Sequence, residues 1–75
     1  MRATPRVIGL AIRLAREEKN LTQQAFADRA RVSRKWLSEV ENGKSTAEIG
    51  KVLRVLSDLG LDLELNPRKQ KETKQ

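Results

Sequence analysis

Residues 21–44 read LTQQAFADRARVSRKWLSEVENGK and contain two short helical segments separated by three residues. Thr22 is a preferred N-cap residue and predicts a helix over residues 23–30, and Ser33 predicts another over residues 34–41. Asn42-Gly43 supplies the stop signal of the second helix. The apolar side chains of this segment fall on one inner face, which comprises Phe26, Ala27, Ala30, Val32, Leu37 and Val40. The pattern predicts a packed helical pair whose second helix projects outward.

The sequence on each side of this pair predicts one further helix. Thr4-Pro5 predicts the first, because Thr caps a helix and Pro fits its first turn, and Asn20 favours its end. Its apolar residues recur with helical spacing, at Ile8, Ala11, Ile12 and Ala15. Ser45-Thr46-Ala47-Glu48 resembles a capping box, in which Glu48 reaches back to the cap N–H, and a helix ending at Gly60 follows. The apolar stripe of that last helix comprises Ile49, Val52, Leu53, Leu56 and Leu59.

Residues 61–65, Leu-Asp-Leu-Glu-Leu, alternate strictly between apolar and charged side chains, which predicts a β-strand that ends at Asn66-Pro67. A lone strand in a helical chain has no partner for its backbone groups. Antiparallel pairing with a second copy would satisfy them and bury Leu61, Leu63 and Leu65 in a dimer interface. We therefore predict one domain over residues 1–65, dimerising through residues 61–65, and a disordered polar tail over residues 66–75. The alternative is a frayed amphipathic extension of the last helix.

Composition limits the classes of protein that this chain can belong to. A chain of 75 residues forms one small domain that buries only about 60% of its unfolded surface, so a partner chain is an expected support. Cys and His are both absent, and we expect no metal, no cofactor and no enzymatic activity. The sequence shows neither a membrane-spanning run nor a signal peptide, so we expect a cytoplasmic protein without membrane association.

The net charge of +6 is compatible with nucleic-acid binding. About half of this excess lies in residues 66–75, however, where it can equally serve a solvated end of the chain.

The motif in residues 21–44 resembles the helix-turn-helix family of the phage-repressor type, also called the Cro or XRE family. The matching residues are Leu21-Thr22-Gln23-Gln24, Phe26-Ala27, Val32-Ser33 and Leu37-Ser38-Glu39-Val40-Glu41-Asn42-Gly43-Lys44. The resemblance implies a mainly α fold, a four-to-five-helix lambda-repressor-like domain whose second motif helix enters the DNA major groove. One position departs from the family, which usually has Gly where this chain has Arg31. If that position needs a positive φ, the side chain costs on the order of 1 kcal/mol.

The last helix and the alternating segment after it resemble the HipB-like antitoxins, whose C-terminal strands pair across a homodimer. This resemblance covers residues 4–65. It implies a transcriptional repressor that binds a palindromic operator in double-stranded DNA, autoregulates its operon and binds a HipA-like serine/threonine kinase toxin. The tail would then be a protease handle or a toxin contact. Two alternatives remain: a free-standing XRE-family regulator without a toxin partner, and a protein-interaction module that binds no DNA.

The family's docking mode assigns roles to individual residues. Arg34 would read guanine, Lys35 would contact a base or a phosphate, and Glu39 would accept from cytosine or pair with Lys35. The expected DNA phosphate contacts are Thr22, Gln23, Gln24, Ser33, Trp36, Ser38 and Lys44. Thr22 and Ser33 are caps first, and Trp36 is equally a half-buried edge of the core. In the resembled family, the residues matching Arg16 and Glu41 form a partly buried ion pair between the first and third helices.

Overall fold

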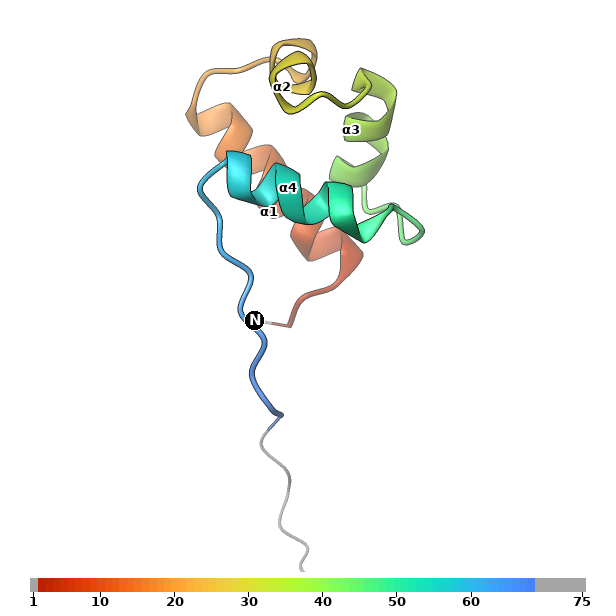
Figure 1. The fold of residues 1–75 in the computed structure, drawn as a ribbon, viewed down its shortest axis with the longest axis vertical. Helices are drawn as coiled ribbons and strands as arrows, with labels where there is room; N and C mark the ends of the chain where they lie inside the picture. Colours follow the sequence, from red (N-terminus) through yellow and green to blue (C-terminus); the bar gives the residue numbers. More distant parts are fainter. Residues whose placement is uncertain (1, 69–75) are drawn as a thin grey trace, which may run out of the picture.

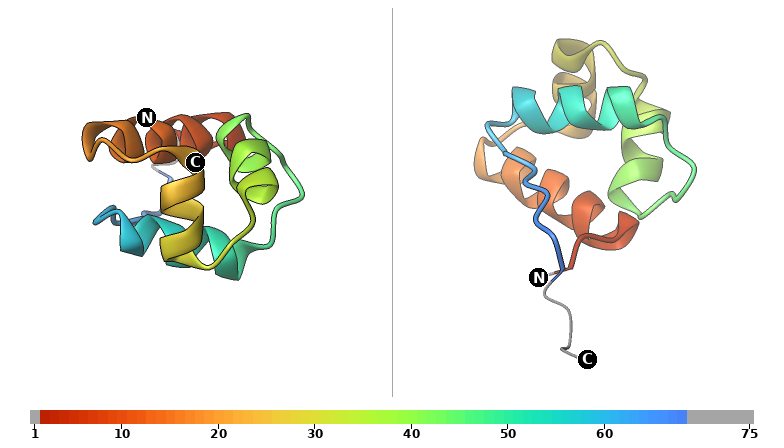
Figure 2. Two further views of the ribbon diagram at one scale, coloured as in Figure 1. Left: turned by 90° about the horizontal axis from the view of Figure 1, so that it is seen from above. Right: turned by 60° about the horizontal axis from the view of Figure 1, so that its bottom comes forward.

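The computed structural model describes residues 2–68, and all regular structure in that range is helical (Figure 1). The four helices are α1 (Pro5–Glu18), α2 (Gln23–Ala30), α3 (Arg34–Glu41) and α4 (Ile49–Asp58). In the left view of Figure 2, α1 and α4 lie on opposite sides of the domain, and α3 packs against both α1 and α2. The mainly helical class is confirmed, with four helices and no fifth one among the described residues.

The first three helices begin where their capping residues predict. The hydroxyls of Thr4, Thr22 and Ser33 accept hydrogen bonds of 3.1, 3.0 and 2.9 Å from the backbone N–H groups three residues later. Each bond satisfies one of the N–H groups that the first helical turn leaves without a partner. The predicted bounds of α2 and α3 are confirmed to the residue.

The start of α4 differs from the predicted capping box. Glu48 is itself the N-cap residue, in an extended conformation, and no side chain caps the helix. Ser45 and Thr46 form a turn instead. The capping-box prediction is therefore wrong, because the helix begins at Ile49 and Glu48 lies outside it rather than in its first turn.

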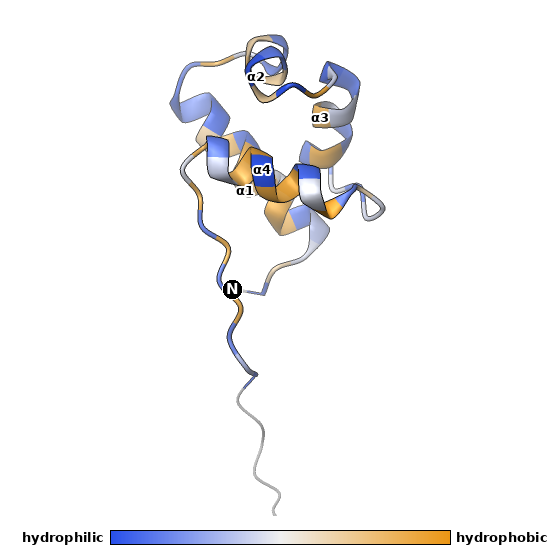
Figure 3. Cartoon of the chain, viewed as in Figure 1, coloured by the Kyte–Doolittle hydropathy of each residue, from blue (hydrophilic) through white to orange (hydrophobic). Residues whose placement is uncertain are grey.

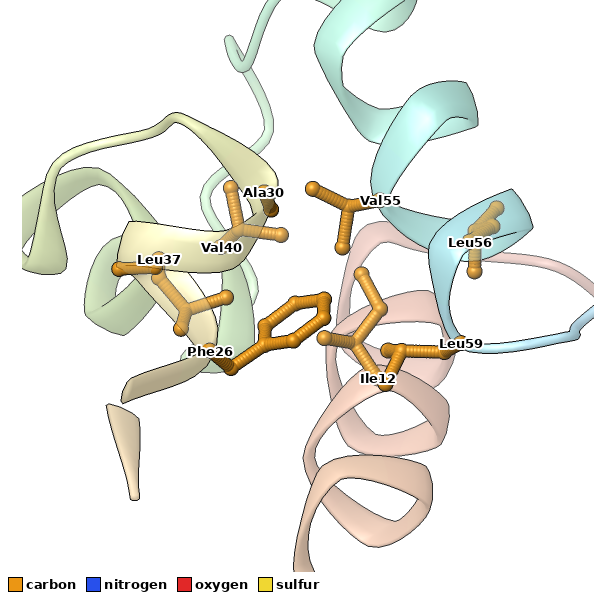
Figure 4. Packing of buried hydrophobic residues seen from close by; sticks show 9 residues of the cluster. Ile12, Phe26, Ala30, Leu37, Val40, Val55, Leu56 and Leu59 are labelled. Carbon is orange, nitrogen blue, oxygen red and sulfur yellow. The ribbon is translucent and has the colours of Figure 1, made fainter. Parts of the chain in front are cut away.

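The core is assembled from all four helices around Phe26 (Figure 4), with Ile12, Leu37 and Val55 also fully buried. In α4 the predicted stripe is only partly right: Ile49 is 69% exposed and Leu53 is 44% exposed, whereas Val55, which the stripe left out, is completely buried. Residues of a helix are about 100° apart, so the inward arc centres on Val52, Val55, Leu56 and Leu59 and leaves Ile49 at its margin. Figure 3 shows apolar and polar residues interspersed along the helices and alternating along the segment that follows α4.

Residues 61–65 form no strand in the described chain, so the strand that was predicted to pair with a second copy is not confirmed. The physical reason is that a strand needs a neighbouring backbone, and no other segment of residues 2–68 lies in a ladder with it. Leu61 packs against the core, but Leu65 is 89% exposed and Leu63 is also exposed. Pairing across a homodimer stays a prediction. Of the predicted tail, residues 69–75 lie outside the described range.

Within residues 2–68 every helix is too short or too polar to cross a bilayer.

The turn between α2 and α3 contains a strained residue. Arg31 is the C-cap of α2 and adopts the left-handed conformation, with φ 59° and ψ 43°. The guanidinium of Arg54 in α4 donates to the carbonyl oxygens of Ala30 and Arg31, at 2.8 and 3.4 Å. These bonds satisfy carbonyl groups at the end of α2 that have no partner within the helix.

Replacing Arg31 by Gly should stabilise the protein, because Gly adopts a positive φ without steric cost and the exposed Arg31 side chain makes no hydrogen bond within residues 2–68. A gain of about 1 kcal/mol corresponds to a rise in melting temperature of roughly 4–8 °C. Thermal unfolding followed by circular dichroism measures it. A clear fall in melting temperature would contradict this account of the turn.

Candidate nucleic-acid interface

Helix α3 turns its first residues outward. Leu37, Val40 and Glu41 are buried on its inner face, whereas Arg34 and Lys35 are exposed directly after the Ser33 cap. The helix is thus anchored along one side and presents two cations on the other. An α-helix held in this way can enter the major groove of DNA with its N-terminal residues toward the base edges.

The side chain of Arg34 lies next to Gln23 at the start of α2. Its Nη1 atom donates to Oε1 of Gln23 at 3.5 Å, and Nε2 of Gln23 donates in turn to Oε1 of Glu41 at 3.1 Å. Because Gln23 gives its amide hydrogen to Glu41, its carbonyl oxygen faces Arg34. We call the side of α3 where Arg34 meets Gln23 of α2 the Gln23 edge. The structure therefore joins a predicted base contact and a predicted phosphate contact through one amide.

Behind the Gln23 edge lies the buried ion pair of Arg16 and Glu41. Two bonds join them, from Nε to Oε2 at 2.7 Å and from Nη2 to Oε1 at 2.9 Å, with side chains only 8% and 3% exposed. Nη1 of Arg16 also donates to the carbonyl of Leu21 at 2.8 Å. The hydrogen bonds that Arg16 donates to the Glu41 carboxylate raise the pKa of Arg16 above its ordinary value, because they favour the charged guanidinium. The pair connects α1 to α3, as the family resemblance implies.

The opposite side of α3 is formed by Trp36, and we call it the Trp36 edge. Trp36 is half-buried and packs against the core, with Nζ of Lys51 5.7 Å from the centre of its ring. This placement matches the half-buried edge that was one of the two interpretations of Trp36. It leaves a DNA contact by the indole as a prediction.

Three of the remaining predicted contacts have side chains with partners inside the protein. Glu39 pairs with Nζ of Lys44 at 3.2 Å, not with Lys35 as one interpretation had it. Nε2 of Gln24 donates to Oδ1 of Asp28 at 2.9 Å. Both pairs are exposed, so a phosphate can compete for them with little cost. Ser38 is half-buried on α3, while Thr22 and Ser33 use their hydroxyls as caps.

Sequence reasoning missed Lys51 and Arg54, which both lie on α4. Lys51 contacts Trp36 and Arg54 caps α2, and each contact joins residues far apart in the chain. No local pattern in the sequence signals such pairs. No cluster of acidic side chains among residues 2–68 is arranged to hold a metal ion.

Comparison with known proteins agrees with this geometry. The family model described as a helix-turn-helix domain matches residues 7–67. A curated relative from Sinorhizobium fredii (strain NBRC 101917 / NGR234), the uncharacterized HTH-type transcriptional regulator y4mF, is 44% identical over 62 residues, covering 83% of this chain and 82% of the relative.

Two solved structures share the fold, each at 22% identity. The first is described as the structure of a HipA-HipB-O2-O3 complex and has a TM-score of 0.79. The match covers 92% of this chain and 97% of the chain in that structure. The second is described as a HipB-O4 20mer complex, with a TM-score of 0.78 and the same coverage.

Proposed function

The chain belongs to the XRE-like helix-turn-helix family of transcriptional regulators, and on that premise we propose that it is a sequence-specific DNA-binding repressor whose recognition helix is α3. The observation that carries the proposal is the exposure of Arg34 and Lys35 at the capped start of a helix whose other face is buried. A repressor of this kind acts in the cytoplasm, where its operator is. We propose no enzymatic activity for it.

We propose a homodimer as the form that binds DNA. Leu63 and Leu65 are exposed in the single copy, and their burial against a second copy would remove apolar area from water while pairing the backbone of residues 61–65. Two-fold symmetry of the dimer would require a palindromic operator with half-sites about 34 Å apart, or a multiple of that distance. A monomer at micromolar concentration in analytical ultracentrifugation would contradict the dimer.

The finer role that we propose is that of an antitoxin bound to a HipA-like serine/threonine kinase toxin. Its support is the shared fold with HipB, one of whose structures is described as a complex with HipA. The alternative is a free-standing repressor, and the relative y4mF is named as a transcriptional regulator. A kinase-like reading frame adjoining this one would favour the antitoxin, and its absence would favour the free-standing regulator.

Selection of bound sequences from a random duplex pool tests the proposal as a whole. We expect enrichment of a two-fold symmetric sequence, with affinity that falls as salt rises because counterions are released from each contacted phosphate. If the purified protein ignores every duplex at low salt, the proposed function is wrong and a protein-interaction module remains.

The Arg34→Ala variant should lose base discrimination at one position in each half-site. A bidentate contact from Arg to guanine contributes about 1–3 kcal/mol of discrimination, so the preference for guanine should fall roughly 5- to 150-fold. The matched control is Arg34→Lys, which keeps the charge without the planar fork of donors and should retain affinity for unselected DNA. Repeating the duplex selection with each variant measures the effect. Unchanged guanine preference in Arg34→Ala would show that Arg34 contacts only phosphates.

A further inference from the structure

We propose that Lys51, on α4, is a DNA phosphate-binding residue for the strand opposite to the one that Gln23 faces, and that the ring of Trp36 holds it in place. This inference rests on the proposed function and names a contact that sequence reasoning did not assign. Three observations carry it: the position of Trp36 on α3, the surroundings of the Lys51 ammonium, and the width of the groove relative to a helix.

The first observation is where Trp36 and Arg34 lie around the axis of α3. Residues of a helix are about 100° apart, so Trp36 lies roughly 200° from Arg34 around the axis of α3. Lys35 falls between them on the exposed face, while Leu37 and Val40 face the core. The Gln23 edge and the Trp36 edge therefore border the exposed face of α3 on opposite sides.

The second observation concerns the charge of Lys51. Among residues 2–68, no carboxylate lies within ion-pair distance of the Lys51 ammonium. Its Nζ atom lies over the Trp36 ring instead, 5.7 Å from the ring centre. A cation over an aromatic face is held in position without neutralising its charge, and its N–H donors remain available to an anion. Lys44, by contrast, already has the Glu39 carboxylate as a partner.

The third observation is the fit between helix and groove. The major groove is about 12 Å wide and a helix with its side chains is about 10–12 Å across, so a helix in the groove has a phosphate backbone on each side. With the exposed face of α3 toward the bases, the Gln23 edge meets one backbone and the Trp36 edge meets the other. The structure places the ammonium group of Lys51 at this second edge, beside the Trp36 ring.

The test compares wild type, Lys51→Met and Lys51→Arg. Two probes are used: the duplex selected by the wild-type protein and a scrambled duplex of the same length. Fluorescence anisotropy over a series of salt concentrations gives the affinity and its salt dependence, and circular dichroism confirms that each variant is folded. For Lys51→Met we expect the slope of log affinity against log salt to shrink by about 1.8, because each of the two protomers of the proposed homodimer loses one phosphate contact worth about 0.9. Its affinity for both duplexes should fall roughly 30-fold at 0.15 M salt, as follows from that slope. Lys51→Arg should keep both values, because it keeps the charge.

Each other outcome overturns the inference. A folded Lys51→Met variant with the wild-type salt slope would show that Lys51 touches no phosphate. A loss confined to the selected duplex would show that Lys51 reads a base. Failure of the wild-type protein to bind either duplex is seen before any variant is compared, and it contradicts the proposed function itself.

Discussion

Replacing Glu41 by Ala should lower the free energy of unfolding by about 3–5 kcal/mol, because it leaves the charge of Arg16 buried without its partner. Arg16 is 8% exposed and gives two hydrogen bonds to the Glu41 carboxylate. The substitution also removes the acceptor that orients Gln23. Stability should therefore fall far more than base preference changes. Denaturant unfolding gives the first quantity, and duplex selection below the lowered melting temperature gives the second.

The matched control is Glu17→Ala, which removes one partner of the exposed ion pair between Arg13 and Glu17 on α1. Such surface pairs contribute about 0–1 kcal/mol, since water replaces the lost partner. A Glu41→Ala variant that melts like wild type but no longer binds DNA would contradict the structural role and indicate a direct contact.

The helices and caps could be predicted from the sequence because their causes are local. A Thr or Ser hydroxyl bonds to a backbone N–H three residues later, so Thr22 and Ser33 define their helices without help from the rest of the chain. The positive φ of Arg31 could also be anticipated from the sequence, because the resembled family usually has Gly at this position of the turn. These signals locate α3 and its exposed first turn.

The rest depends on contacts that no local pattern contains. The way α4 lies against its neighbours decides which of its residues face the core. As a result Val55 is buried, whereas Ile49, which was expected to be buried, is exposed. The contacts of Lys51 with Trp36 and of Arg54 with α2 join separate helices. The proposed strand over residues 61–65 depends on a second molecule, which a single chain does not supply.

Gly9 shows how far a tertiary contact can reverse a local rule. In an exposed helix, Gly→Ala stabilises by up to about 1 kcal/mol, because Ala loses less backbone entropy on folding. Gly9 lies in α1 where that helix crosses α3, and a Cβ atom there would be 2.2 Å from the carbonyl oxygen of Val40 and 3.0 Å from that of Glu41. Both obstacles are backbone atoms, so no side chain can rotate away.

We therefore expect Gly9→Ala to destabilise the protein by about 3 kcal/mol, the upper part of the range for overpacked sites, and to lower the melting temperature by roughly 12 °C or more. The matched control is Gly50→Ala in the first turn of α4, where a Cβ atom would meet only Oε2 of Glu48 at 3.7 Å. That variant should melt at or above the wild-type temperature. The same chemical change thus has opposite signs at two helical positions. If both variants are stabilised, α1 and α3 do not cross as closely as described, and the ion pair beneath α3 would have to be placed differently.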